Sequence, residues 1–277
     1  MNAAEYERLD RAERDHWWFR GLRGLLAQLL RTSLPADPAP TSILDAGCGT
    51  GGNLQLIAEQ LHPRHLAGFD LSDDAVLRAR EKNPGADVYR SDLTRPELRH
   101  APYELVLCCD VLYATGLGPA RDGLAALRDS LAPGGALLLH VPAYQWLYSA
   151  HDAAVHTRER FTLGQIRDLL ASLELQIETL TYRLSLLFPL VVLRRLPDLL
   201  GLRAVGRDEA VSDLSIPSGP VNRLLLSIVT FENWLIARGI RFPFGCSIVA
   251  VGRKPLAGEI AAPAFVSVPT PAPENAT

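Results

Sequence analysis

Short apolar runs alternate with segments of helical character between residues 42 and 141. Runs of this kind, bounded by turn residues, are typical of strands that a parallel sheet buries on both faces. The alternation of strands and helices predicts a doubly wound α/β fold around a parallel sheet. The predicted strands cover residues 42–46, 65–70, 87–90, 104–110 and 136–141, and the predicted helices cover residues 53–60, 73–82 and 121–131.

A helical segment precedes this sheet and contains three consecutive aromatic residues, Trp17, Trp18 and Phe19. Adjacent side chains point in different directions around a helix, so the three rings cannot all enter one core. Two interpretations stay open: a helix packed on the edge of the domain with one ring exposed, or an aromatic lid over a bound ligand. We assign residues 1–34 to this N-terminal helical cap, which the prolines of residues 35–40 separate from the sheet.

The pattern changes after the fifth predicted strand. A polar and aromatic loop follows, and a strand of alternating polarity is predicted at residues 175–182. Two apolar helical segments come before a last strand at residues 244–251, and charged residues interrupt both. Neither supplies the roughly 20 clean apolar residues of a membrane span. The predicted domains are a sheet domain of residues 41–183 and 244–254, a helical insertion of residues 184–243, and a disordered Pro- and Ala-rich tail of residues 255–277.

Composition narrows the class of protein. A chain of 277 residues that is 48% hydrophobic can bury one large core, which favours a single elaborated α/β domain. The net charge of −3 and the lack of a basic run give no reason to expect a nucleic-acid partner. The four cysteines form no CxxC pair and lie in apolar or glycine-turn segments, so we expect reduced thiols and a cytoplasmic location. The N-terminal segment has no apolar signal-peptide core.

A glycine turn follows the first predicted strand, with Gly47, Gly49 and Gly51 at alternate positions. Glycines let the backbone approach a ligand, and the following helix offers free N–H groups. The turn alone fits a dinucleotide or another adenosine cofactor. Asp45 lies just before the first glycine, and its carboxylate suits a cationic ligand group better than a pyrophosphate. This charge favours a ligand with a sulfonium or amine over NAD.

Residues 44–51, Leu-Asp-Ala-Gly-Cys-Gly-Thr-Gly, resemble the cofactor motif of the class I S-adenosylmethionine-dependent methyltransferases. Residues 68–72 resemble the second motif of that family, residues 91–93 its adenine-contacting turn, and residues 110–112 the motif that ends its fourth strand. The resemblance implies a Rossmann-like, seven-stranded sheet that ends in an antiparallel hairpin, with the insertion inside the hairpin. It also implies S-adenosyl-L-methionine as cofactor and S-adenosyl-L-homocysteine as product.

The resemblance further implies which residues bind the cofactor, with Asp70 on the ribose hydroxyls. The expected cofactor-binding residues are Asp45, Ala46, Gly47, Gly49, Asn53, Asp70, Leu71, Ser91, Asp92, Leu93 and Asp110 from the sheet domain, and Trp18 and Arg20 from the cap.

The segment His-Trp-Trp-Phe-Arg at residues 16–20, together with residues 141–144, resembles a bacterial subgroup associated with polysaccharide or specialised-metabolite pathways.

The chain departs from the family at one position near the transferred methyl group. The family commonly has Glu and His after the Asp-Val-Leu of residues 110–112, and this chain has Tyr113 and Ala114. The acceptor, and methyl transfer itself, are therefore left open by the sequence.

Methyl transfer relies on alignment of the reactants and needs a general base only for a protonated acceptor. His151 and His156, in a predicted loop, are the candidate bases together with Tyr113; hydrogen bonds that fix the loop are the other interpretation for the two histidines. His140 lies in a predicted strand and is expected to be a satisfied core histidine. His151, Asp152 and His156 lack helical metal-ligand spacing, so no metal is predicted.

The leading hypothesis is a methyltransferase for a small-molecule acceptor that is hydrophobic or is an intermediate of a specialised-metabolite or polysaccharide pathway. A fold reused for a non-methylating reaction such as cyclisation, or for binding alone, is kept as the alternative. The apolar insertion is expected to form an acceptor pocket, a homodimer interface or a peripheral contact with a membrane.

Overall fold

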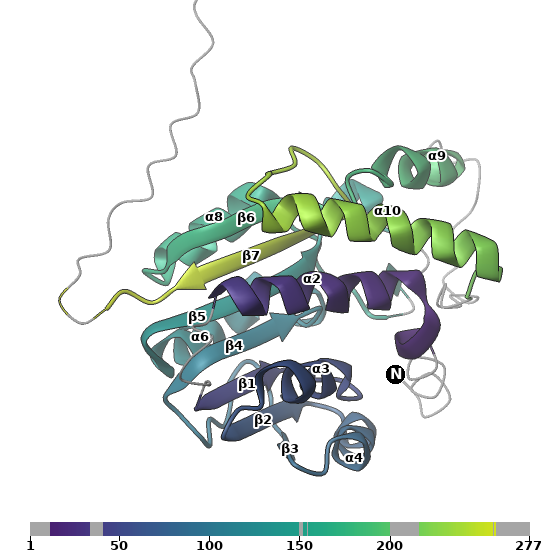
Figure 1. Ribbon diagram of the computed structural model, residues 1–277. Helices are drawn as coiled ribbons and strands as arrows, with labels where there is room; N and C mark the ends of the chain where they lie inside the picture. Colours follow the sequence, from purple (N-terminus) through teal and green to yellow (C-terminus); the bar gives the residue numbers. More distant parts are fainter. Residues whose placement is uncertain are drawn as a thin grey trace, which may run out of the picture.

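The computed structural model describes residues 12–33, 41–149, 152–153, 155–199, 216–256 and 258. These residues form a seven-stranded sheet in the order β3-β2-β1-β4-β5-β7-β6, with helices on both faces (Figure 1). β7 runs antiparallel to β5 and to β6, and the other neighbouring strands are parallel. The expected α/β fold with a final antiparallel pair is confirmed. The predicted linker at 35–40 and nearly all of the predicted tail lie outside the described residues.

The elements follow one another as the sequence predicts, with a short helix after β4 that it does not predict. The strands are β1 (Ser42–Ala46), β2 (His65–Asp70), β3 (Asp87–Arg90), β4 (Tyr103–Cys109), β5 (Leu131–Pro142), β6 (Gln176–Arg183) and β7 (Ser247–Arg253). The helices are α2 (Trp17–Ser33), α3 (Gly52–Leu61), α4 (Asp73–Lys82), α5 (Leu112–Thr115), α6 (Leu117–Asp129), η1 (Gln145–Leu147), α8 (Leu163–Ser172), α9 (Phe188–Leu199) and α10 (Gly219–Ala237).

The sheet separates two hydrophobic cores. Leu105 and Leu107 of β4 face a core shared with α2, α3 and α4, while Val106 and Cys108 face a core shared with α6 and α8. Because successive side chains of a strand point to opposite faces, a strand buried on both faces is apolar throughout. This is why the central strands are visible in the sequence as continuous apolar runs.

β5 begins five residues before its predicted start. Leu131 pairs with Tyr103 and Ala136 with Leu105, so the register shifts between these two pairs and the extra residues lie on β5. The carbonyl of Gly135 accepts a hydrogen bond from the N–H of Lys254, and the N–H of Gly134 donates to the carbonyl of that lysine. The Pro-Gly-Gly segment that reads as a turn is therefore an irregular first part of the strand.

The insertion packs on the N-terminal helix, and α2 and α10 lie side by side over one face of the sheet (Figure 1). Asn222 Oδ1 accepts a hydrogen bond from the N–H of Trp17 at 2.9 Å, and Asn233 Nδ2 donates to the carbonyl of Gly21 at 2.7 Å. Polar side chains of α10 thus hold α2 in place. Within the described residues, no helix combines the length and apolar character that crossing a membrane requires.

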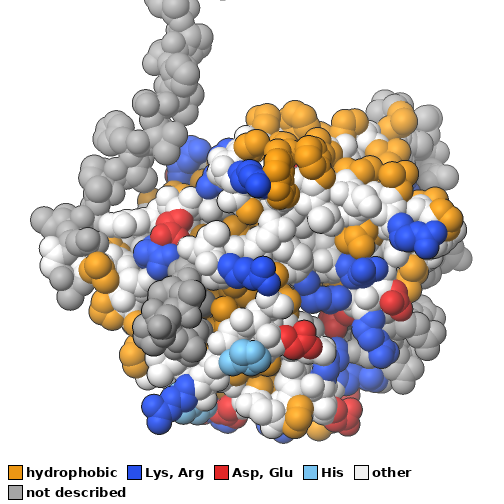
Figure 2. All heavy atoms as spheres, viewed as in Figure 1, with side chains coloured by type: hydrophobic (Ala, Val, Ile, Leu, Met, Phe, Trp, Pro, Cys, Tyr) orange, Lys and Arg blue, Asp and Glu red, His pale blue; other side chains and the backbone are white. Residues whose placement is uncertain are grey.

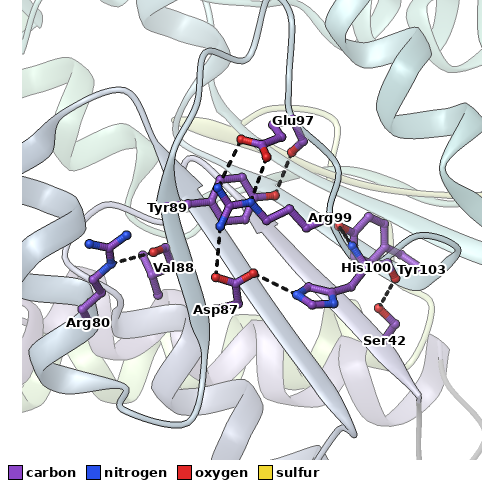
Figure 3. Close-up of polar contacts among 9 residues, drawn as sticks. All are labelled: Ser42, Arg80, Asp87, Val88, Tyr89, Glu97, Arg99, His100 and Tyr103. Atoms are coloured by element: carbon purple, nitrogen blue, oxygen red, sulfur yellow. Dashed lines mark hydrogen bonds and ion pairs between the residues drawn. The ribbon is translucent and has the colours of Figure 1, made fainter.

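A polar network fixes the segment that follows β3 (Figure 3). Tyr89 Oη donates to the carbonyl of Glu97 at 2.7 Å, and the guanidinium of Arg99 lies 3.9 Å from the centre of the Tyr89 ring. His100 Nε2 lies 2.9 Å from Asp87 Oδ2, and the carbonyl of His100 accepts from Ser42 Oγ at 2.7 Å. These contacts anchor the segment that begins with the predicted adenine turn at residues 91–93.

Candidate functional site

The glycine turn joins β1 to α3, and its three alternate glycines have positive φ, at 78° for Gly47, 54° for Gly49 and 85° for Gly51. A Cβ on Gly47 would lie 2.2 Å from Val111 Cγ2, and one on Gly51 would lie 2.4 Å from Asn83 Nδ2. A Cβ on Gly49 would meet nothing within 4 Å. Packing within the protein therefore explains Gly47 and Gly51, whereas Gly49 borders open space that a ligand can enter.

Asp70 ends β2 beside this turn. Its Oδ2 accepts a hydrogen bond from the N–H of Gly49 at 3.0 Å, and its Oδ1 accepts from the N–H of Ser72 at 2.9 Å. Burial raises the pKa of the Asp70 carboxyl, and these backbone N–H groups act against that rise. The carboxylate is thus fixed at the end of the strand, where each oxygen keeps a lone pair for a further donor.

Asp45 lies at the C-terminal end of β1, fully buried, and neither carboxylate oxygen has a hydrogen-bond partner within the described residues. Burial, and then the negative charges of Asp70 and Glu13, raise its pKa to about 7. An ionised carboxylate buried without a partner is costly. The site therefore suits a ligand that brings positive charge to this position.

Glu13 comes from the segment before α2 and adds a third carboxylate. Its Oε2 accepts hydrogen bonds from Thr50 Oγ1 at 2.7 Å and from Lys82 Nζ at 3.1 Å. Glu13, Thr50 and Lys82 are not predicted from the sequence, because partners 37 and 69 positions apart leave no local pattern. Glu13, Asp45 and Asp70 together surround the glycine turn with negative charge.

A row of polar side chains crosses the sheet from the end of β4. His140 Nδ1 lies 2.9 Å from Asp110 Oδ2, and His140 Nε2 lies 3.0 Å from Ser247 Oγ. Both ring nitrogens have partners, as expected for a core histidine. These partners place the proton on Nδ1, facing the carboxylate, and let Nε2 accept from the serine hydroxyl. The ring of Trp18 covers His140 edge-on at 6.0 Å.

Arg183 ends the row on β6. Its side chain is fully buried, and none of its guanidinium nitrogens has a hydrogen-bond partner within the described residues. Burial lowers its pKa to about 10, against the opposing effect of the Glu232 and Asp110 carboxylates. The group is therefore a buried cation at neutral pH that these two carboxylates stabilise through their charge. Neither Arg183 nor Glu232 carries a sequence signal that would have identified it.

Residues 44–137 match the family model described as a methyltransferase domain. This part of the chain, which spans β1 to the middle of β5, is similar to a methyltransferase domain.

Curated relatives of this domain are similar over a limited part of their length. Trans-aconitate 2-methyltransferase from Acidovorax sp. (strain JS42) is 33% identical over 108 residues, which are 39% of this chain and 40% of the relative. Isonocardicin synthase from Nocardia uniformis subsp. tsuyamanensis is 34% identical over 108 residues, which are 37% of this chain and 35% of the relative. The chain thus spans well under half the length of these relatives.

A solved structure covers more of the chain. The plantazolicin methyltransferase BpumL, in complex with a triazolic desmethylPZN analog and SAH, aligns with a TM-score of 0.52 over 90% of each chain at 16% identity. At this identity the similarity shows the fold alone.

Two of the other residues predicted to bind the cofactor lie in the turn after β3. Ser91 Oγ accepts from the N–H of Glu97 and Asp92 Oδ1 accepts from the N–H of Thr94, so both shape the turn after β3. The remaining ones differ in exposure: Leu71 and Arg20 are exposed, Asn53 is half-buried in the first turn of α3, and Ala46 and Leu93 are buried.

Of the three predicted catalytic residues, the structure describes Tyr113 and His156, and the loop that carries His156 lies beside the helix that carries Tyr113. Tyr113 lies in α5, three residues after Asp110, and its carbonyl accepts from the N–H of Arg158 at 2.7 Å and of Glu159 at 3.2 Å. These bonds place the loop around residues 156–159 beside α5. His156 is exposed in that loop with a φ of 58°. His151 lies outside the described residues.

Asp152, considered together with His151 and His156 as a metal ligand in the sequence analysis, is already paired within the protein. Its carboxylate pairs with Arg160 at 2.5 Å in a buried ion pair, and its second oxygen accepts from the N–H of Ser149 at 2.9 Å. Arg160 also donates to the carbonyl of Ala143 at 2.9 Å. The pair therefore fixes the loop after β5.

Proposed function

We propose that the protein is an S-adenosyl-L-methionine-dependent methyltransferase that acts on a small-molecule acceptor. The observation that supports this most strongly is the buried carboxylate of Asp45, which has no partner of its own at the end of β1. A cofactor with a sulfonium and an ammonium group supplies the positive charge that this position calls for. The methyltransferase domain and the names of the relatives point to the same activity.

The residues around the glycine turn fit this cofactor. Asp45 and Glu13 would face its cationic groups, Asp70 its ribose hydroxyls, and Gly49 leaves the open space beside it. Residues 91–93 would border the adenine, and Trp18 would cover the site from α2. When bound, the cofactor supplies a methyl group made electrophilic by its cationic sulfur.

A protonated acceptor must lose a proton when it gains the methyl group, and the Asp110–His140 pair is placed to receive it. The Asp110 side chain is 26% exposed, while His140 is buried behind it. We assign proton removal to the Asp110 carboxylate, with His140 as a positioning residue. His156, His151 and Tyr113 are the competing bases, and their substitution one at a time decides among them.

The acceptor that we propose is hydrophobic, or an intermediate of a specialised-metabolite or polysaccharide pathway. Aromatic side chains gather next to the loop after β5: the ring of Tyr144 lies 5.0 Å from that of Tyr182 and 5.6 Å from that of Trp146. Phe188, at the start of α9, lies 6.0 Å from both Tyr144 and Trp146. These rings favour an apolar acceptor group at that edge.

A second candidate is a non-methylating reaction that uses the same cofactor. Two observations favour it: a relative of similar identity is named a synthase, and Tyr113 and Ala114 replace the residues common in the family. The cofactor product separates the two reactions, because methyl transfer releases S-adenosyl-L-homocysteine and transfer of another part releases a different adenosine fragment.

Calorimetry with both cofactor forms tests the proposal. We expect one site per chain for S-adenosyl-L-methionine and for S-adenosyl-L-homocysteine, with affinity reduced at least about tenfold in Asp70→Ala because a hydroxyl–carboxylate hydrogen bond is lost. Asp168→Ala, on α8 and away from the glycine turn, is the matched control. Absence of binding by the folded wild-type protein contradicts the proposal.

We also propose a cytoplasmic location. Cys48, Cys108, Cys109 and Cys246 are free, which suits a reducing compartment. Fractionation of cells that make the tagged protein, with labelling of the thiols before lysis, tests this.

A further inference from the structure

Three polar side chains of α10 are buried, and four of its large apolar side chains are exposed. Asn222, Glu232 and Asn233 are buried among the contacts that join α10 to α2 and to the end of β6. The Glu232 carboxylate accepts from the N–H of Leu184 at 2.5 Å and of Leu186 at 2.8 Å. A helix that faces water on its outer side has the opposite arrangement.

The outer face of α10 continues onto α9. Ten of the fifteen large apolar side chains that are exposed among the described residues lie between residues 184 and 244. Figure 2 shows apolar side chains gathered along the edge of the molecule formed by α9 and α10. We define the α9–α10 patch by its six most prominent members, with their exposed fractions: Leu190 57%, Leu193 65%, Val221 47%, Leu224 61%, Phe231 54% and Trp234 45%. A patch of this kind marks an interaction surface.

The exposed charged side chains that the structure describes beside the patch have one sign. Among the side chains described between residues 184 and 246, the exposed charged ones are arginines, and the only carboxylate, Glu232, is buried. The guanidinium of Arg238 stacks 3.6 Å from the centre of the Trp234 ring, within the patch. This surface is basic although the chain as a whole has a net charge of −3. Apolar side chains with arginines and a tryptophan at their edge match the interface of a bilayer that contains anionic lipid.

We propose that the α9–α10 patch docks on a membrane surface that contains anionic lipid. The inference goes beyond the proposed function, because binding to a membrane is independent of the reaction. A second copy of the chain fits less well: a two-fold interface would bring the same face of both copies together, and arginine would meet arginine with no exposed carboxylate among the described residues of this surface to pair with.

The patch also borders the loop near the candidate site. Phe188 at the start of α9 contacts Phe244 at 5.3 Å and Trp146 at 6.0 Å, and Trp146 is itself 47% exposed. Trp146 belongs to η1, which follows β5 at the edge of the sheet that carries Asp110. Docking through the patch would hold this loop close to the lipid, where an acceptor with an apolar tail resides.

Sedimentation with vesicles of phosphatidylcholine, with and without phosphatidylglycerol, tests the proposal. We expect the wild-type protein to sediment with the anionic vesicles and to be released by salt. Leu224→Asp with Phe231→Asp should weaken this binding at least about tenfold, because both charges would enter the apolar layer. Leu77→Asp, equally exposed on α4, is the matched control and should bind like the wild type. Arg223→Glu with Arg238→Glu should also weaken binding, whereas Arg64→Glu with Arg121→Glu should not.

Two results overturn the proposal. One is a wild-type protein that stays in the supernatant with all vesicles, whether light scattering finds it as a monomer or as a dimer that Phe231→Asp dissociates. The other is binding that Leu77→Asp weakens as much as the patch variants do. Binding of S-adenosyl-L-homocysteine, measured on the same variants, shows that they are folded and tests the proposed function separately.

Discussion

His140 Nδ1 lies 3.0 Å from Asp110 Oδ1 and 2.9 Å from Asp110 Oδ2, so one ring N–H holds both oxygens of the carboxylate at the end of β4. Asp110 has a φ of 55°, a conformation that non-glycine residues rarely adopt and that often marks a functional position. Ser247 holds the far side of the ring. The carboxylate is therefore fixed in orientation by groups from two other strands.

Asp110→Asn should lower kcat about 10²-fold or more while leaving the Kd for S-adenosyl-L-homocysteine within about threefold, because the amide cannot accept the acceptor proton. His140→Ala should shift the pH profile of kcat, as expected for a positioning residue, and Ser247→Ala should have a smaller effect. A large rise in Kd with kcat unchanged would instead assign Asp110 to the cofactor.

Asp45 should make cofactor binding depend on pH. Its pKa of about 7 in the free protein means that the carboxyl is protonated below neutrality, and a cationic ligand must displace that proton. Affinity should rise about tenfold per pH unit below pH 7 and level off above it. Calorimetry in buffers of different ionisation enthalpy should detect proton release on binding, and Asp45→Asn should remove most of it. An affinity that falls with rising pH would contradict a cationic group at this carboxylate.

Substitution of the glycines in the turn should have two different effects, one mainly on the stability of the fold and the other mainly on cofactor binding. Gly47→Ala should destabilise the fold by more than about 2 kcal/mol, because the added Cβ meets Val111 and the backbone is left-handed. Gly49→Ala should cost only about 1 to 2 kcal/mol for its backbone while weakening cofactor binding, because its Cβ enters open space. Urea unfolding and calorimetry on both variants measure the two effects, and equal losses of stability would refute the distinction.

The charge of Glu232 should contribute to the stability of the fold mainly by compensating the buried charge of Arg183. Glu232→Gln keeps a side-chain acceptor for the N–H groups of residues 184 and 186 but leaves a buried guanidinium without the charge of this carboxylate, and should lower the free energy of unfolding by about 3 to 5 kcal/mol. Arg183→Met combined with Glu232→Gln removes both charges and should be less destabilising than Glu232→Gln alone. Denaturant unfolding of the two variants compares them, and a double variant less stable than the single one would show that the two charges are not coupled.

Much of the fold follows from local pattern. The inner strands β1 and β2 are buried on both faces, and their apolar runs predict both with correct bounds. The start of β5 is missed because Pro133 and two glycines look like a turn, although neighbouring strands hold them. Hydrogen bonds between strands that are far apart in the sequence leave no local pattern from which the start of a strand can be predicted.

The site was predictable only where a motif spans adjacent residues. Asp45, Gly49 and Asp70 belong to such motifs. The partners that define the site's charge, Glu13 and Arg183, come from other parts of the chain and are recognisable only once the fold brings them in. The exposed apolar side chains of α10 are likewise recognisable only when its inward side is known.

The central claim is most directly tested by following both products of turnover at once. Purified protein is incubated with S-adenosyl-L-methionine labelled in its methyl group and with an organic extract and an aqueous extract of cells as acceptor sources. The prediction is one S-adenosyl-L-homocysteine released for each labelled methyl group found on an acceptor, with lower turnover by Asp70→Ala when the cofactor is limiting. Release of a different adenosine fragment, or folded protein that binds the cofactor and transfers no label from it, would contradict methyl transfer.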